Sequence, residues 1–171
     1  MTIRAIFEST IRYFVAFFIF VYGAAKPLQF GSGGNLPDTP VNELTGMELM
    51  WAFFGYSTGL PIIIGILQVT GALLLLFPRT KIMGILLLLP IMSNIVLFDI
   101  FYGVQQGATI NAILFLIILI VLLFLEKQKL LEVFRIITAK KDKNPKAIPL
   151  FFLSATLAAI SFFVYTYLIQ H

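Results

Sequence analysis

Five apolar segments separated by polar connections dominate the pattern of this 171-residue chain. They cover residues 10–30, 58–77, 82–102, 110–125 and 149–169. Each is close to the ~20 residues that a helix needs to cross the hydrocarbon core of a bilayer. The pattern predicts an all-α membrane protein, an antiparallel bundle of transmembrane helices.

The first apolar segment has its centre at residues 13–25 and ends in Lys26 and Pro27. Because a proline removes a helical hydrogen bond, we expect the helix to stop at Pro27. A rival interpretation is a signal peptide, with Gly23 and Ala25 as the small residues before a cleavage site. The aromatic-rich centre of the segment argues against it.

The polar segment 31–47 is rich in Gly, Pro, Asn and Asp, which is typical of a loop with turns. Residues 48–56 follow it and are apolar, but nine residues are too few to span a membrane. Their Trp51 and Tyr56 favour a segment that lies in the interface or re-enters the membrane.

After the fourth apolar segment, residues 126–147 are basic, with apolar residues at helical spacing among the lysines. This pattern predicts a helix on the membrane surface, attracted to anionic head groups. The chain thus divides into a four-helix core at 1–125 with an outer loop at 31–57, a basic connector at 126–147, and a fifth transmembrane helix at 148–171.

The composition excludes several classes of protein and of metal site. Hydrophobic residues make up 60% of the chain and charged residues 12%, whereas soluble proteins carry roughly 25% charged residues. The net charge of +4 comes from basic residues beside apolar segments, so it indicates membrane topology and not nucleic acid. The absence of cysteine excludes disulfides and thiolate metal sites. The single histidine, His171, cannot build a two-histidine haem or a di-iron site.

The distribution of lysine and arginine predicts the orientation. With the N-terminus in the cytoplasm, every basic residue except Lys26 falls on the cytoplasmic side. The prediction is a multi-pass protein of the bacterial inner membrane with an extracytoplasmic C-terminus.

Polar residues within the predicted spans gather between the midplane and the outer face. Polar side chains are costly in lipid, so they need partners inside the protein and mark packing or function. We predict an outward-facing cavity, with Lys26 paired to Asp99, lined by Tyr22, Lys26, Gln68, Asn94, Asp99 and Asn111. In the alternative interpretation Lys26 extends to the outer head groups and the amides only join helices. Gln68 shares a helix face with Gly65 and Ala72, which would let another helix approach it.

No Gly-rich phosphate loop, no paired carboxylates within a span and no Ser/His/Asp set occurs, so the catalytic residues stay unassigned and no metal site is predicted. A bound quinone, a haem or a partner subunit could still supply chemistry.

The first helix ends in Gly23-Ala24-Ala25-Lys26-Pro27-Leu28, and the second carries Gly65-Ile66-Leu67-Gln68, Gly71-Ala72 and Arg79-Thr80. These motifs resemble the DoxX family of small bacterial membrane proteins over residues 10–125. Two departures are a glutamine at Gln68, where the family commonly has a glutamate, and the extra helix after Glu126.

The resemblance implies a four-helix membrane core and an association with membrane redox complexes such as thiosulfate:quinone oxidoreductase. We therefore expect an accessory or quinone-linked subunit of a redox or sulfur-metabolism system, with quinone as its cofactor and other membrane redox subunits as partners. A small transporter or channel subunit and an assembly protein without a ligand remain as alternatives. The sequence leaves open whether the chain forms a homo-oligomer.

Overall fold

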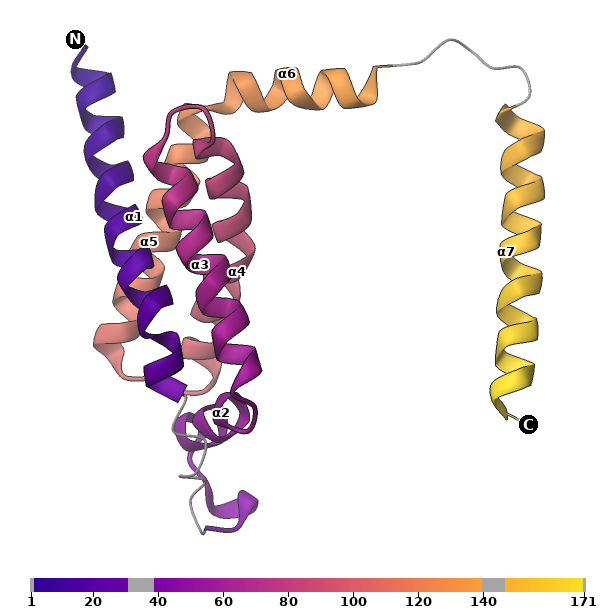
Figure 1. Ribbon diagram of the computed structural model, residues 1–171, viewed down its shortest axis with the longest axis horizontal. Coiled ribbons are helices and arrows are strands. Elements are labelled where there is room, and N and C mark those ends of the chain that lie inside the picture. The colour runs from indigo at the N-terminus through magenta and orange to yellow at the C-terminus, as the bar shows by residue number, and fades with distance from the viewer. Residues whose placement is uncertain (1, 31–38, 140–146, 171) are drawn as a thin grey trace. The chain divides into compact units, whose positions relative to one another are not determined.

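The computed structural model describes residues 2–30, 39–139 and 147–170, and the chain is helical throughout this part, without strands (Figure 1). It divides into two compact units, Met1–Leu130 and Leu131–His171. The elements in chain order are α1 (Ile3–Phe30), a short 3-10 turn (Val41–Glu43), α2 (Gly46–Gly55), α3 (Gly59–Leu76), α4 (Lys81–Phe101), α5 (Gln106–Leu125), α6 (Lys127–Thr138) and α7 (Ala147–Gln170).

Five of the described helices are long and apolar enough to cross a membrane, namely α1, α3, α4, α5 and α7. This confirms the five predicted spans. Two boundaries differ from the prediction by more than two residues. Helix α1 begins earlier, at Ile3, and α5 begins at Gln106 instead of residue 110. Gly103 adopts a φ of 64° between α4 and α5, a left-handed conformation that glycine takes without steric cost.

The prediction that Pro27 ends the first helix is wrong, because α1 continues to Phe30. A proline removes one donor, and near the end of a transmembrane helix neighbouring groups can compensate for it. The carbonyl that loses this donor belongs to Gly23, four residues earlier, and its oxygen lies against Gly65 of α3.

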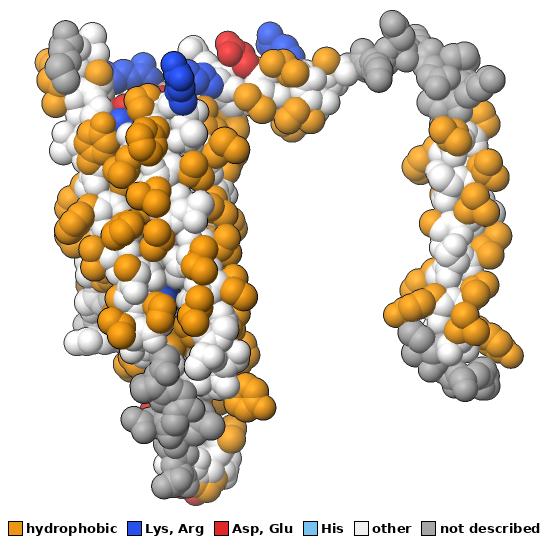
Figure 2. Space-filling model, in the orientation of Figure 1, with side chains coloured by type: hydrophobic (Ala, Val, Ile, Leu, Met, Phe, Trp, Pro, Cys, Tyr) orange, Lys and Arg blue, Asp and Glu red, His pale blue; other side chains and the backbone are white. Residues whose placement is uncertain are grey.

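In the first unit, α1 packs along α3 and α5, while α4 packs along α3 and α5 (Figure 1). The core between these helices is apolar and includes the fully buried side chains of Ile19, Leu75, Leu88 and Leu119. Glycines bring the helices together: a Cβ on Gly84 would lie 2.8 Å from the carbonyl oxygen of Gly71. The visible surface of this unit is covered by hydrophobic side chains over most of its length, as a lipid-facing surface requires (Figure 2).

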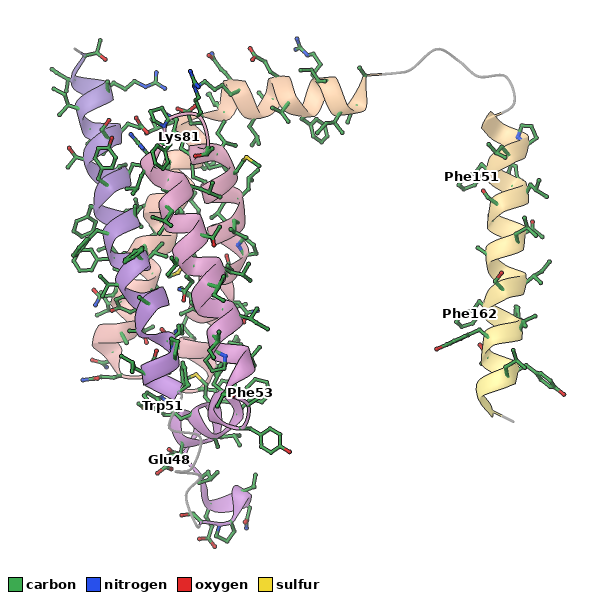
Figure 3. All side chains as sticks on the ribbon, viewed as in Figure 1. Glu48, Trp51, Phe53, Lys81, Phe151 and Phe162 are labelled. Carbon is green, nitrogen blue, oxygen red and sulfur yellow. The ribbon has the colours of Figure 1, made fainter. Side chains whose placement is uncertain are left out.

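Charged side chains from α1, α4, α6 and the junction of α5 with α6 form an ion-pair network at one end of the first unit, which we call the basic end. Lys81 lies 3.2 Å from Glu8 and 2.6 Å from Glu126, and Lys129 lies 2.9 Å from Glu126. Arg12 lies 3.0 Å from Glu8. Figure 3 places Lys81 at this end, and Glu48 and Trp51 of α2 at the opposite end, the α2 end.

The Arg12 side chain is 3% exposed and closes the end of α3. Its Nη1 donates hydrogen bonds to the carbonyl oxygens of Leu75 (2.5 Å) and Leu76 (2.9 Å). The last four carbonyls of a helix have no intrahelical partner, and a cation there also complements the helix dipole. Arg12 thereby ties α1 to α3 at the basic end.

Helix α6 confirms the helix predicted in the basic connector. The apolar residues at helical spacing in the sequence are Leu130, which is half-buried, and Val133, Phe134 and Ile137, which are exposed. In the second unit, the candidate span Pro149–Leu168 of α7 has no residue buried in the described chain. The predicted cytoplasmic Lys140, Lys141, Lys143 and Lys146, like the loop residues 31–38, lie outside the described residues.

Candidate functional site

A cavity of about 220 Å³ lies within the first unit, toward its α2 end. Its wall comes from α1, α3, α4 and α5, and residues of α2 also line it. The polar lining includes Tyr22, Lys26, Gln29, Gln68, Asp99 and Gln105, and the remaining lining is mainly aromatic, aliphatic and methionine side chains.

Four of the six predicted site residues line this cavity: Tyr22, Lys26, Gln68 and Asp99. The structure does not bring the other two, Asn94 and Asn111, to it. Both asparagines are exposed, on faces of α4 and α5 that point away from the buried core. Their depth in the membrane follows from their positions along the spans, but amide chemistry alone does not say which face of a helix is buried.

Gln68 is 1% exposed, and its side-chain oxygen Oε1 has no hydrogen-bond partner among the described residues. Its Nε2 only contacts the sulfur of Met92, at 3.9 Å. Leaving a buried polar group unpaired costs about 1–3 kcal/mol. The Gln68 amide therefore offers a hydrogen bond to whatever occupies the cavity.

Lys26 is 9% exposed and its side chain lines the cavity. Its Nζ donates a hydrogen bond to Oε1 of Gln29 at 3.3 Å and lies 5.3 Å from the centre of the Phe30 ring. The alternative in which Lys26 extends to the head groups does not match this conformation. Lys26 instead belongs to the lining of the cavity.

Asp99 shares the cavity with Lys26 and is also 9% exposed. The two charges interact electrostatically. Within the described part of the chain, however, no ion pair of 4 Å or less joins them, so the predicted direct pair is not closed. A cation and an anion thus face the same space, and the site as a whole carries no net charge from this pair.

Glycines on α1 and α3 determine the positions of Gln68 and Lys26 along the cavity. A Cβ on Gly23 would lie 2.8 Å from Cβ of Gln68, and a Cβ on Gly65 would lie 3.3 Å from Cβ of Lys26. Gln68 is therefore opposite Gly23, and Lys26 is opposite Gly65. Gly23 and Lys26 are three residues apart on α1, as Gly65 and Gln68 are on α3. At a rise of 1.5 Å per residue, Gln68 therefore lies about 4.5 Å deeper than Lys26, measured from the α2 end.

Aromatic rings of α1, α2 and α4 line the cavity at the α2 end, and we call them the aromatic lid. The ring of Phe30 lies 5.1 Å from Trp51 and 5.1 Å from Phe54, and Phe54 lies 5.5 Å from Phe98. Such separations are typical of favourable ring pairs. Sequence reasoning missed this lid, although the aromatic content of residues 48–56 was its signal.

Local sequence fixes the start of the lid helix α2. Thr45 caps it: its hydroxyl and N–H donate to Oε2 of Glu48 at 2.7 and 2.8 Å, and the N–H of Glu48 donates back to the Thr45 hydroxyl. This is a capping box, a frequent start signal of helices. These hydrogen bonds hold the pKa of the Glu48 carboxyl below its ordinary value. The predicted interfacial segment is thus a defined helix and not a loop.

The described residues contain no group of three or more His, Cys, Asp or Glu side chains that could hold a metal ion. The cavity offers one ammonium group, one carboxylate and one unpaired amide oxygen inside an apolar wall. Such an arrangement can bind and orient a small molecule with an apolar body and polar ends.

The chain is similar to a protein of Bacillus subtilis (strain 168) that bears the name "Uncharacterized protein YwoB". The two are 38% identical over 137 residues, which cover 78% of this chain and 85% of the Bacillus protein. No protein-family model matches the chain, and no solved structure matches it significantly.

Proposed function

The chain belongs to the family of the Bacillus subtilis protein YwoB, and we propose that it binds a quinone-like head group in the cavity of its first unit. The observation that carries the proposal is the unpaired Oε1 of Gln68, buried in the wall of a cavity that also contains Lys26 and Asp99. A neutral ring with hydroxyls at opposite ends, the reduced quinol form, can donate to the Gln68 oxygen and to Asp99 and can accept from Lys26.

The size of the cavity supports a single ring. An engineered protein cavity of about 150 Å³ binds benzene, and the cavity here is about 220 Å³. It therefore suits one substituted six-membered ring and is far too small for a haem. The methionines and aromatic residues of the wall match the apolar faces of such a ring.

The positions of the polar groups support oxygens at both ends of that ring. Lys26 donates toward one end, and Gln68, about 4.5 Å deeper by helical rise, meets the other. A hydroxyl can both donate and accept, so it satisfies the Gln68 amide. Because Lys26 and Asp99 balance each other, a neutral ligand fits better than an ion.

Within this proposal the first unit is an antiparallel, DoxX-like four-helix core, and the protein is an accessory subunit of a redox or sulfur-metabolism complex in the bacterial inner membrane. The basic end faces the cytoplasm, in accordance with the excess of Lys and Arg there (Figure 2). The cavity then belongs to the extracytoplasmic half. The ion-pair network and Arg12 block the opposite side, which disfavours a transport path through the unit.

Fluorescence of Trp51 tests the proposal, because this residue is the sole tryptophan of the chain and lines the cavity. Purified protein in liposomes is titrated with durohydroquinone, the reduced form of duroquinone, with durene as the control ligand, which has the same methylated ring without oxygens. We expect saturable quenching by durohydroquinone, and a Kd about tenfold higher in Gln68→Leu, the loss of one hydrogen bond of about 1.4 kcal/mol.

Asn111→Leu is the matched control, since it also replaces an amide within a spanning helix but outside the cavity. Its Kd should equal that of the unchanged chain. If quenching does not saturate, or if Gln68→Leu binds durohydroquinone as tightly as Asn111→Leu does, the cavity is not a quinol site. Solute flux in the same liposomes would then favour transport. A stable partner without flux would favour an assembly role.

A further inference from the structure

One face of α4 points away from the core of the first unit, and we call it the α4 outer stripe. Its exposed residues recur every three or four positions, at Met83, Leu86, Pro90, Asn94 and Leu97. The buried residues of α4, including Gly84, Leu88 and Met92, lie on the opposite face. No described residue of the first unit covers the stripe.

Asn94 breaks the apolar character of this stripe. Its side chain is exposed and makes no hydrogen bond to any described residue. Thirteen residues separate it from Lys81, so it lies about 20 Å along a helix of about 30 Å. An amide at this depth has neither water nor head groups to bind, and an unsatisfied amide in hydrocarbon is unfavourable.

We propose that the α4 outer stripe is the interface of a symmetric homodimer in which the two Asn94 amides hydrogen-bond to each other. An amide has both donor and acceptor groups, so it is complementary to its own copy. Asparagine side chains on transmembrane helices are known to join helices in this way.

Membrane insertion itself favours a second copy as the occupant. All copies insert in the same direction, so identical residues lie at identical depths. A two-fold axis along the membrane normal then brings each stripe against its counterpart, and Asn94 meets Asn94. A different membrane protein would need a polar group at this one depth by coincidence. The inference is independent of the ligand in the cavity, because the stripe lies on the other face of α4.

The chain contains no cysteine, so single cysteines report proximity without background. Leu97→Cys lies on the stripe next to Asn94 and leaves the amide in place. Ile110→Cys on α5 is the control, because it is also exposed and also four residues from the α2 end of its helix. After oxidation in liposomes at low protein density, we expect a disulfide-linked dimer from Leu97→Cys and none from Ile110→Cys.

A second measurement isolates the amide. Förster transfer between labelled copies, followed as lipid is added, gives the dimer dissociation constant. We expect Asn94→Leu to raise this constant about tenfold, in keeping with the strength of interhelical hydrogen bonds in membranes. Asn94→Gln, which keeps an amide, should restore part of the affinity. The melting temperature and Trp51 emission of each variant confirm that it is folded.

Four results would overturn the proposal. The first is equal crosslinking of Leu97→Cys and Ile110→Cys, which indicates random collision. The second is a dissociation constant that Asn94→Leu leaves unchanged, and the third is a chain that is monomeric by Förster transfer at all densities. A crosslink of Leu97→Cys in cells to another protein, instead of to itself, would also exclude the homodimer.

Discussion

Gly23 of α1 and Gly65 of α3 lie so close together that a Cβ on Gly65 would come within 2.5 Å of the carbonyl oxygen of Gly23. This contact brings α1 against α3 at the level of the cavity. It also determines where the neighbouring polar side chains lie, because Gln68 faces Gly23 and Lys26 faces Gly65. The glycine contact is therefore part of the construction of the site.

Gly65→Ala should destabilise the first unit and weaken ligand binding. The new methyl group meets a backbone oxygen, which cannot move aside as a flexible side chain can. Overpacking of this kind typically costs about 1–3 kcal/mol. The free energy of unfolding in mixed detergent and SDS micelles measures the loss, and Trp51 quenching measures the effect on the cavity.

Gly107→Ala is the control for this substitution. Gly107 also lies in a spanning helix, α5, but a Cβ there would meet nothing within 4 Å. The free energy of unfolding of Gly107→Ala should stay the same or rise slightly, since alanine is the better helix former. Equal losses in the two variants would show that the Gly23–Gly65 contact is not tight.

Replacement of Arg12 by methionine should lower stability by about 2–3 kcal/mol, because hydrogen bonds from a charged group contribute about 1.5–3 kcal/mol. The variant leaves the carbonyls of Leu75 and Leu76 without their donor at the end of α3. Unfolding in SDS micelles again provides the measurement. Arg79→Met serves as the comparison, since Arg79 is exposed in the turn before α4. A loss as large in Arg79→Met would mean that net charge, and not the Arg12 contacts, is responsible.

The spans and the polar face of α3 could be predicted from the sequence because both follow from local periodicity. Continuous apolar runs report length, and the glycine and alanine around Gln68 report where a neighbouring helix can approach. The burial of Gln68 and the small-residue contacts of α3 confirm the second inference.

Features that depend on the rotation of one helix against another could not be predicted. Asn94 and Asp99 lie five residues apart, so helical spacing places them on different faces of α4, but it does not say that Asp99 faces the cavity and Asn94 faces outward. The lid is a second example, since Trp51 meets Phe30 only after the chain turns back on itself. Pro27 is a third, because its effect on α1 depends on the packing of Gly23 against α3.

Acid should weaken the ion-pair network at the basic end by protonating the Glu126 carboxylate. Burial alone would raise the pKa of Glu126, but the hydrogen bonds and charges of Lys81 and Lys129 outweigh this effect and lower the pKa below its ordinary value. A carboxyl with a lowered pKa stabilises the fold fully above the ordinary value of about 4.3 and loses this contribution as the pH falls through it. We expect stability to decline in acid below that value.

Glu126→Gln should lower stability at neutral pH and make the decline in acid shallower, because no charge remains to be lost at this position. Glu132→Gln, an exposed residue on α6, should leave the acid decline unchanged. The free energy of unfolding, measured between pH 3 and pH 7, distinguishes Glu126→Gln from Glu132→Gln. An unchanged acid decline in Glu126→Gln would assign it to other carboxyls.

Labelling of single cysteines tests the orientation. In intact cells, a membrane-impermeant maleimide should label Glu43→Cys, in the turn before α2, and should label Gln128→Cys on α6 only after permeabilisation. The reason is the excess of Lys and Arg at the basic end, which should remain in the cytoplasm. Labelling of Gln128→Cys in intact cells would reverse the orientation and place the cavity in the cytoplasmic half.

A double-mutant cycle of Lys26→Met and Asp99→Asn tests whether the two charges of the cavity depend on each other. Each single variant leaves the other charge in a mostly apolar cavity without compensation, whereas the double variant leaves neither. We expect the sum of the losses in unfolding free energy of the two single variants to exceed the loss of the double variant by about 1 kcal/mol, within the range for interacting sites.

Lys26→Met combined with Glu43→Gln is the control, since Glu43 is exposed and lies outside the cavity lining. That pair should be additive within about 0.5 kcal/mol. Additive losses for Lys26 and Asp99 as well would mean that each charge is compensated separately, Lys26 by Gln29 and the Phe30 ring, and that the cavity does not rely on charge balance to select a neutral ligand.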